Sequence, residues 1–220
     1  MIWNSRFLFL HYPKVAGKSL TEYFVRAWEP PIHGIVARGQ RVELERIRDG
    51  LHLETGHSHQ NAIAARTVLE RRGIDIRGLE AIFLAVRLPY DLAYSTYRYL
   101  RANHAAAADR PAFALAARST FPEFLERFKP SPFERWMAVD GRDLGNLSVL
   151  RFEHLREDIE AAARKFGFAP VELGHINATA RDTYEAHMTS ALEPLVYANY
   201  RELFARGWYQ RQQFGESASC

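Results

Sequence analysis

The sequence predicts an α/β fold with a central, mainly parallel sheet flanked by helices. Largely apolar runs at 7–10, 81–86 and 147–152 lack the alternation of half-exposed strands, which is typical of strands buried on both faces. Helical patterns follow these runs, at 20–28, 90–103 and 155–166. Strands that alternate with helices in this way favour parallel neighbours in one sheet.

The first strand and helix are the most clearly marked. The run Phe7–Leu10 is followed by Pro13. Apolar residues then return with the i, i+3, i+4, i+7, i+8 spacing of an amphipathic helix, at Leu20, Tyr23, Phe24, Ala27 and Trp28. The prolines at 30 and 31 end that helix, because proline cannot continue it. The order is therefore strand, tight loop, helix.

The next segment is predicted as a glycine-containing loop over 32–40 and a short helix over 41–49. A strand at 51–55 then leads into Gly56-His57-Ser58-His59. Such a strand would bring imidazoles to the carboxyl edge of the sheet, where α/β folds hold their ligands. A helix over 61–72 stops at a glycine, a frequent helix terminator.

In the second half, Pro89 begins the helix over 90–103. Thr120 and Glu123 form the pattern of a capping box at the start of a helix over 121–128. Gly167 is the expected C-cap of the helix over 155–166, and one amphipathic helix is predicted over 189–206. The segments 104–120 and 129–146 are interpreted as loops.

Composition bounds the class of protein. The chain of 220 residues, 47% hydrophobic and 25% charged, suits a single domain over 1–220 with one core. A net charge of +3 is too small to indicate nucleic acid, and no apolar run reaches the ~20 residues of a membrane span. The one cysteine, Cys220, allows no internal disulfide, which fits a reducing compartment.

The loop between the first strand and helix has the character of an anion site. Gly17 lies where backbone N–H groups and the helix dipole meet, and Lys14, Lys18 and Ser19 add charge and a hydroxyl. A phosphate is the expected ligand. Ser19 has a plainer interpretation as a helix N-cap, which uses the same geometry.

A nucleotide-triphosphate loop is the competing interpretation. Gly17-Lys18-Ser19 ends a Walker A motif, but the motif's first glycine would fall on Tyr12. That motif also needs a carboxylate for Mg²⁺ after a neighbouring strand. The strand at 81–86 is followed by Arg87, which suits a second phosphate better than a metal.

These residues carry a resemblance to a known family. His11–Leu20 resembles the 5′-phosphosulfate loop of sulfotransferases that use 3′-phosphoadenosine-5′-phosphosulfate, particularly their carbohydrate and Golgi-type branch. Arg87-Leu88-Pro89 with Ser95 resembles the family's 3′-phosphate element. The departures are Lys18 for a usual serine or threonine, Leu88 for an aspartate and Leu92 for an arginine.

The resemblance implies a P-loop-like three-layer fold and roles for specific residues. Lys14 would stabilise charge on the departing phosphate, and the 5′ side of the nucleotide would be held by Lys14, Gly17, Lys18, Ser19 and Leu20. Arg87 and Ser95 would hold the 3′-phosphate. A strand-terminal arginine paired only with a carboxylate is the plainer alternative.

The two histidines His57 and His59 are the candidate general bases, because neutral imidazole suits proton removal near neutral pH. Gly-His-Ser-His is similar to the His-x-His element of glycan 2-O-type sulfotransferases, which makes His57 the first choice and Glu54 the reserve. A structural or surface role is the alternative for each. Zinc held by these two and His11 is a weaker interpretation, since the family needs no metal.

The resemblance therefore implies an enzyme that transfers a sulfuryl group from 3′-phosphoadenosine-5′-phosphosulfate to a hydroxyl acceptor, most simply a glycan, releasing adenosine-3′,5′-bisphosphate. Without the membrane anchor of secretory relatives, a cytoplasmic, bacterial-type member is expected. Asn177 resembles a late asparagine of the family near the cofactor. Two rivals remain: a small-molecule kinase with a degenerate Walker A loop, and a non-catalytic nucleotide-binding module.

Overall fold

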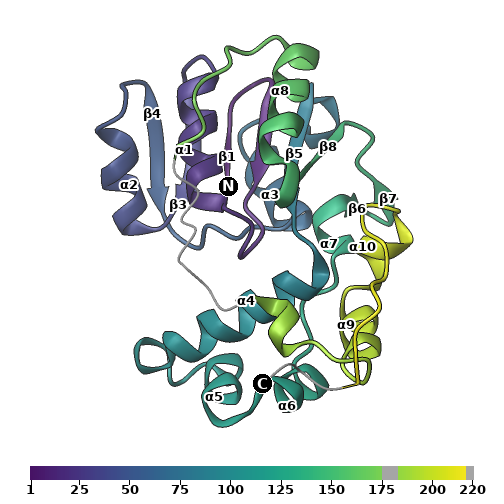
Figure 1. Ribbon diagram of the computed structural model, residues 1–220. Coiled ribbons are helices and arrows are strands. Elements are labelled where there is room, and N and C mark those ends of the chain that lie inside the picture. Colours follow the sequence, from purple (N-terminus) through teal and green to yellow (C-terminus); the bar gives the residue numbers. More distant parts are fainter. Residues whose placement is uncertain (175–182, 217–220) are drawn as a thin grey trace. The chain divides into compact units, whose positions relative to one another are not determined.

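Two units built from interleaved stretches of the chain make up the fold. The computed structural model describes residues 1–174 and 183–216 (Figure 1). The first unit comprises Met1–Val86 and Glu134–Ala178, and the second comprises Arg87–Phe133 and Thr179–Cys220. The first unit holds the sheet and the second is helical, so each is described by itself.

A six-stranded sheet in the order β4-β3-β1-β2-β5-β8 forms the first unit. Its strands are β1 (Ile2–Trp3), β2 (Phe7–Leu10), β3 (Ile32–Val36), β4 (Leu51–Thr55), β5 (Ala81–Val86) and β8 (Leu147–Arg151). The pairs β2–β5, β5–β8 and β3–β4 are parallel, and only β1 runs antiparallel to its neighbours β2 and β3. The predicted α/β fold with a mainly parallel sheet is confirmed.

Aromatic side chains pack helices onto one face of this sheet. Phe83 of β5 stacks on Phe24 of α1 (Gly17–Ala27) at 4.6 Å between ring centroids and meets Phe166 of α8 (Leu155–Phe166) edge-on at 5.6 Å. Helices α1 and α8 therefore cover the same face (Figure 1). Burial of these rings contributes most of the favourable free energy of packing here.

The opposite face is marked by Trp3, because Trp3 pairs with Leu8 and so points away from the Phe9 side. The guanidinium of Arg72 lies 5.2 Å from the Trp3 ring centroid, directly after α3 (Ala62–Glu70). Helix α3 thus covers this second face, together with α7 (Glu134–Met137) and the hairpin β6 (Ala138–Val139) and β7 (Arg142–Asp143) that pack on it. Helix α2 (Arg38–Glu45) packs beside β4.

The second unit is organised around α4 (Pro89–Ala102), which contacts the other helices of the unit. These are α5 (Pro111–Arg118), α6 (Phe121–Arg127), α9 (Glu193–Asn199) and, through α9, α10 (Arg201–Ala205). The Tyr97 hydroxyl donates to the Ser119 carbonyl at 2.9 Å. The predicted capping box is confirmed, since the Glu123 carboxylate accepts from the Thr120 N–H at 2.7 Å.

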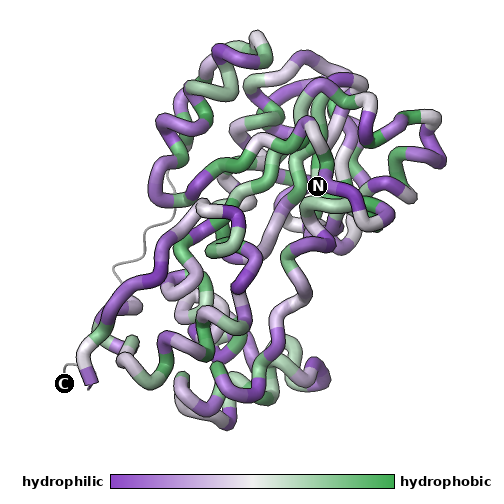
Figure 2. The backbone as a smooth tube through the Cα atoms, turned by 90° about the vertical axis from the view of Figure 1, so that its right-hand side faces the viewer, coloured by the Kyte–Doolittle hydropathy of each residue, from purple (hydrophilic) through white to green (hydrophobic). Residues whose placement is uncertain are grey.

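The hydropathy of the strands and helices matches their positions in the fold. Figure 2 shows hydrophobic colouring along the sheet strands, whereas the helices alternate between hydrophobic and hydrophilic residues. Strands β2 and β5 are buried at every position, as expected for strands covered on both faces. Within residues 1–174 and 183–216, the helices are all too short or too polar to cross a membrane.

The prediction of a loop over 32–40 is wrong, because 32–36 forms β3 in the sheet. Gly34 was the misleading signal. A β-carbon at Gly34 would lie 2.8 Å from Ile2 Cγ2 and 2.9 Å from Leu53 Cδ2, so glycine there permits close strand approach instead of a turn.

Three further predictions differ from the structure. The helix predicted over 41–49 is α2, which begins at Arg38 and ends at Glu45. The single helix over 189–206 is two helices, because Tyr200 has φ −127° and ψ 27° between them. The segments interpreted as loops contain α5, α7 and the β6–β7 hairpin.

Candidate functional site

The loop between β2 and α1 has an unusual backbone. Lys14 and Ala16 have φ values of 66° and 58°, in the left-handed region that residues with a β-carbon rarely adopt. Such a conformation costs about 1–3 kcal/mol per residue and is concentrated at ligand-binding positions. Between them Val15 is fully buried and anchors the loop in the core.

The first turn of α1 opens onto this loop. Ala16 is the N-cap, and its methyl group cannot accept a hydrogen bond. The plainer interpretation of Ser19 as the helix N-cap is therefore wrong, because Ser19 lies within the first turn. A left-handed residue followed by helical residues turns successive N–H groups toward one point, the arrangement that binds phosphate.

The position of this loop in the sheet also favours ligand binding. From β2 the chain crosses through α1 to β3 and β4 on one side, and after α3 it returns to β5 on the other side of β2. Ligands of open α/β sheets bind at this reversal, outside the carboxyl ends of the strands. The loop from Tyr12 to Ala16 lies at that point.

His11 connects the end of β2 with the start of α1. Its side chain is buried at 7% exposure. A β-carbon on Gly17 would lie 1.7 Å from His11 Nε2, so the imidazole packs directly on the glycine backbone. Gly17 is thus required because the ring occupies the space of a side chain.

His59 reaches the same place from the end of β4. The rings of His11 and His59 meet edge-on with centroids 4.5 Å apart, and His57 lies 5.6 Å from His59. His59 Nδ1 lies 2.8 Å from the His11 carbonyl oxygen. Because a carbonyl only accepts, Nδ1 carries the proton and Nε2 keeps its lone pair. His57 is exposed, whereas His11 is buried and His59 is half-buried.

Burial and nearby positive charge lower the pKa of two histidines in this cluster. Burial lowers the pKa of His11 well below 6.5, helped by the positive charges of His59, the chain's amino group and Lys18. Burial also lowers the pKa of His59, helped by His57, the amino group and Lys14 and opposed by the bond to the His11 carbonyl. Both rings are therefore neutral near pH 7. Burial lowers the pKa of the chain's amino group to about 5, so this group is also neutral at that pH, and Lys14 and Lys18 are the cations that act on the cluster. Such surroundings attract an anion.

Glu54, the reserve candidate for the base, forms an ion pair with Arg72. Its carboxylate accepts a hydrogen bond from the Arg72 guanidinium and lies on the exposed surface. This ion pair makes Glu54 a weak candidate for proton transfer.

The second predicted element lies in the helical unit. Arg87 Nη1 lies 3.4 Å from Ser95 Oγ, and the side chains of both residues are buried, at 6% and 7% exposure. The structure thus brings together the two residues predicted to share a phosphate. Sequence reasoning missed Asp91, whose carboxylate accepts from Arg87 Nε at 2.6 Å and pairs with Nη2 at 2.5 Å. The i, i+4 spacing from Arg87, just before α4, to Asp91 in its first turn was the available signal.

This pairing bears on the charge of the Arg87 site. Asp91 uses the Nε and Nη2 side of the guanidinium, while Nη1 is directed to Ser95. A phosphate oxygen could therefore bind Nη1 and the Ser95 hydroxyl together. The carboxylate both orients the arginine and offsets part of its charge.

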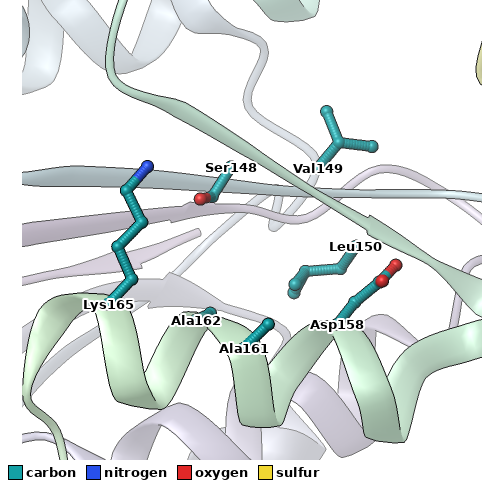
Figure 3. A pocket seen from close by; sticks show the side chains of 7 residues that line it. All are labelled: Ser148, Val149, Leu150, Asp158, Ala161, Ala162 and Lys165. Atoms are coloured by element: carbon teal, nitrogen blue, oxygen red, sulfur yellow. The ribbon is translucent and has the colours of Figure 1, made fainter.

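A shallow cavity of about 180 Å³ lies between β8 and α8 (Figure 3). It is lined by Ser148, Val149, Leu150, Asp158, Ala161, Ala162 and Lys165. Asp158 accepts from the Arg151 backbone N–H at 2.7 Å and from its guanidinium at 2.8 Å. None of the predicted site residues lines it, so its chemistry is separate from the loop after β2.

In the part of the chain that the structure describes, no group of three histidine, cysteine, aspartate or glutamate side chains has an arrangement that could hold a metal ion. The zinc hypothesis for His11, His57 and His59 thus gains no support from the geometry. Asn177 and Cys220 lie outside the described residues.

Comparison with known proteins gave no match to a family model, a curated protein or a solved structure.

Proposed function

We propose that this protein is a sulfotransferase that moves a sulfuryl group from 3′-phosphoadenosine-5′-phosphosulfate to a hydroxyl acceptor, most simply on a carbohydrate. The observation that carries the proposal is the loop after β2, where two left-handed residues and two lysines adjoin a pair of neutral histidines. The proposal includes a P-loop-like fold and a cytoplasmic location.

The 5′ side of the nucleotide fits the start of α1. Helix α1 has 11 residues, and its N-cap, Ala16, cannot cap it through a side chain. The backbone N–H groups of Gly17, Lys18, Ser19 and Leu20 and the Ser19 hydroxyl are the proposed ligands of the 5′-phosphate, with Lys18 adding charge.

Lys14 is the proposed transition-state stabiliser. As the acceptor oxygen forms its bond to sulfur, the bond from sulfur to the 5′-phosphate oxygen breaks and leaves its electron pair on that oxygen. A cation at this point stabilises the transition state more than the ground state. Lys14 sits at the tip of the loop, and its charge acts on His59.

The acceptor hydroxyl must lose its proton in the same step. His57 and His59 are the proposed bases, and the Nδ1–H···O bond to His11 makes His59 Nε2 a proton acceptor. A neutral ring near pH 7 is the form that this role requires. His57 is more exposed and suits contact with the acceptor.

The 3′-phosphate is assigned to Arg87 and Ser95 of the helical unit. The Arg87 guanidinium is oriented by Asp91 and directs Nη1 to the serine hydroxyl. Arginine donors are suited to phosphate because their N–H groups are fixed in one plane. This assignment distinguishes a 3′-phosphorylated nucleotide from ATP.

A thermal-shift comparison tests the proposal. The protein is heated with adenosine-3′,5′-bisphosphate, with ATP, and with ATP plus Mg²⁺. At 100 times the Kd a ligand stabilises the folded state by about 2.7 kcal/mol, so the bisphosphate should raise Tm by several degrees and ATP should not. A rise with ATP and Mg²⁺ alone would favour the kinase alternative.

A transfer assay then separates an enzyme from a binding module. Labelled 3′-phosphoadenosine-5′-phosphosulfate is incubated with the protein and polysaccharide, phenol or alcohol acceptors. Transfer to a carbohydrate supports the full proposal. Nucleotide binding with no transfer to any hydroxyl would indicate a non-catalytic module.

A further inference from the structure

His11 has a place in the fold that the assigned roles do not use. Its ring lies between Phe9, at 6.0 Å between centroids, and the edge of His59, and it also packs on Gly17. Its carbonyl accepts the hydrogen bond from His59 Nδ1. One residue therefore contacts both the first residue of α1 and the candidate base.

We infer that His11 is a positioning residue: its ring and carbonyl together hold His59 as the Nδ1–H tautomer beside the anion loop, with Nε2 ready to take a proton. The inference rests on the proposed function for its catalytic consequence, but the tautomer and the packing can be measured without any reaction.

The surroundings of His59 explain why a rigid neighbour is needed. An exposed imidazole exchanges freely between its two tautomers, and only one of them leaves Nε2 as an acceptor. The groups that act on His59 are His57, Lys14, the chain's amino group and the His11 carbonyl. Of these, only the carbonyl is hydrogen-bonded to the ring, whereas the others act through charge, so the carbonyl is the group that selects the tautomer.

The contact with Gly17 links this choice to the anion loop. Since the His11 ring fills the space beside Gly17, a shift of the ring would move either the start of α1 or His59. The His11 side chain thus fixes the position of His59 relative to the loop that would hold the leaving phosphate.

The first test is nitrogen NMR of the full chain with ¹⁵N-labelled histidine, with the His59 signal assigned by His59→Gln. In the wild type, His59 should show protonated Nδ1 and unprotonated Nε2 at pH 7. His11→Ala keeps the backbone carbonyl but removes the ring that packs on His59. A fraction of the Nε2–H tautomer should therefore appear, and the pKa of His59 should rise toward its ordinary value because burial is relaxed. His52→Ala, which alters a histidine stacked on His33, is the control and should leave both unchanged.

The second test uses stability, so that it works even where one variant folds poorly. Gly17→Ala should lower Tm, because its methyl group would collide with the His11 ring. In the His11→Ala background the same Gly17→Ala change should lower Tm much less, because the ring is gone. An equal loss of Tm in the two backgrounds would show that the ring is not the neighbour that constrains Gly17.

Activity supplies the last readout. If the wild type transfers sulfate, His11→Ala should lower kcat by about 10–100-fold, as for other groups that orient a reacting side chain, and should move the acid limb of the pH profile to higher pH. An Nε2–H tautomer in the wild type, or an unchanged tautomer and pKa in His11→Ala, would overturn the inference. Absence of transfer by the wild type would instead count against the proposed function.

Discussion

Lys14 combines a rare backbone conformation with a positively charged side chain. Its φ of 66° bends the chain so that the side chain leaves the loop near His59. Replacement by another residue with a β-carbon keeps the same backbone cost, since the penalty arises from that carbon. Alanine at this position therefore tests the charge and leaves the strain in place.

We predict that Lys14→Ala lowers kcat by about 10²–10³, the usual cost of losing one transition-state donor. Steady-state sulfate transfer is the measurement, with Lys129→Ala as the control, since Lys129 is bonded to Asn199 in the helical unit. Equal turnover in the wild type and Lys14→Ala would remove Lys14 from the mechanism.

Asp91 orients the Arg87 guanidinium, so that Nη1 is directed to Ser95. Asp91 holds the Nε and Nη2 edge, so Nη1 remains directed to Ser95 without the entropy of a free side chain. Leu88 and Leu92 replace polar residues of the resembling motif, and Asp91 supplies the carboxylate from another position on the helix.

Arg87→Ala should weaken binding of adenosine-3′,5′-bisphosphate by about 10–100-fold and binding of adenosine-5′-phosphate much less, because a charge-assisted hydrogen bond contributes roughly 1.5–3 kcal/mol. Calorimetry with both nucleotides measures the difference. Arg98→Ala is the matched control, because Arg98 is an exposed arginine of α4, the helix that follows Arg87. Equal losses for the two nucleotides would contradict the 3′-phosphate assignment.

At the scale of elements, the sequence predicted the caps at helix ends well. Gly167 ends α8 in the left-handed conformation, with φ 68°, and its N–H donates to the Ala163 carbonyl at 2.9 Å. Glycine adopts this conformation without the steric cost of a β-carbon. The capping box at Thr120 was also predicted from the sequence, because caps depend on neighbouring residues in the chain.

Gly167→Ala is predicted to destabilise the protein by about 1 kcal/mol, the cost of placing a β-carbon in the left-handed region. A β-carbon at Gly167 or at Gly145 would meet no atom within 4 Å, but only Gly167 has a positive φ. Gly145→Ala is therefore a control for chain stiffness. Denaturation by urea measures both, and similar losses would argue against a backbone cause.

At the scale of the whole molecule, each unit is assembled from two separate stretches of chain. In the helical unit Glu193 joins them, because its buried carboxylate accepts from the Tyr90 hydroxyl at 2.8 Å and from Arg211 Nε at 2.9 Å. The Arg211 pair holds the pKa of Glu193 below its usual value, despite partial burial. Residues more than 100 positions apart thus depend on one carboxylate.

Glu193→Ala leaves the fully buried Tyr90 hydroxyl without this acceptor, which costs about 1–3 kcal/mol. Hydrogen exchange should accelerate in 87–133 and 183–216 together, while β2 and β5 keep their protection. The exposed Glu126 offers a control in Glu126→Ala. Equal acceleration in the strands would show that the two units open as one.

Much of the sheet could be predicted from the sequence. Strands β2 and β5 and helices α1, α3, α4, α6 and α8 were found because apolar periodicity and caps are local signals. The two-residue strand β1 was not found, and β3 was hidden by Gly34. The break at Tyr200 depends on packing and leaves no mark in the periodicity.

Some features of the candidate site could likewise be predicted from the sequence, and others could not. The sequence by itself determined an α/β sheet, and it predicts an anion-binding loop at Lys14–Leu20 and a shared role for Arg87 and Ser95. Only the tertiary structure decided that His11 packs on Gly17, that its carbonyl selects one tautomer of His59, and that Asp91 engages Arg87. Local patterns record what each segment buries, whereas contacts between the ends of separate strands depend on sheet order, which no single segment encodes.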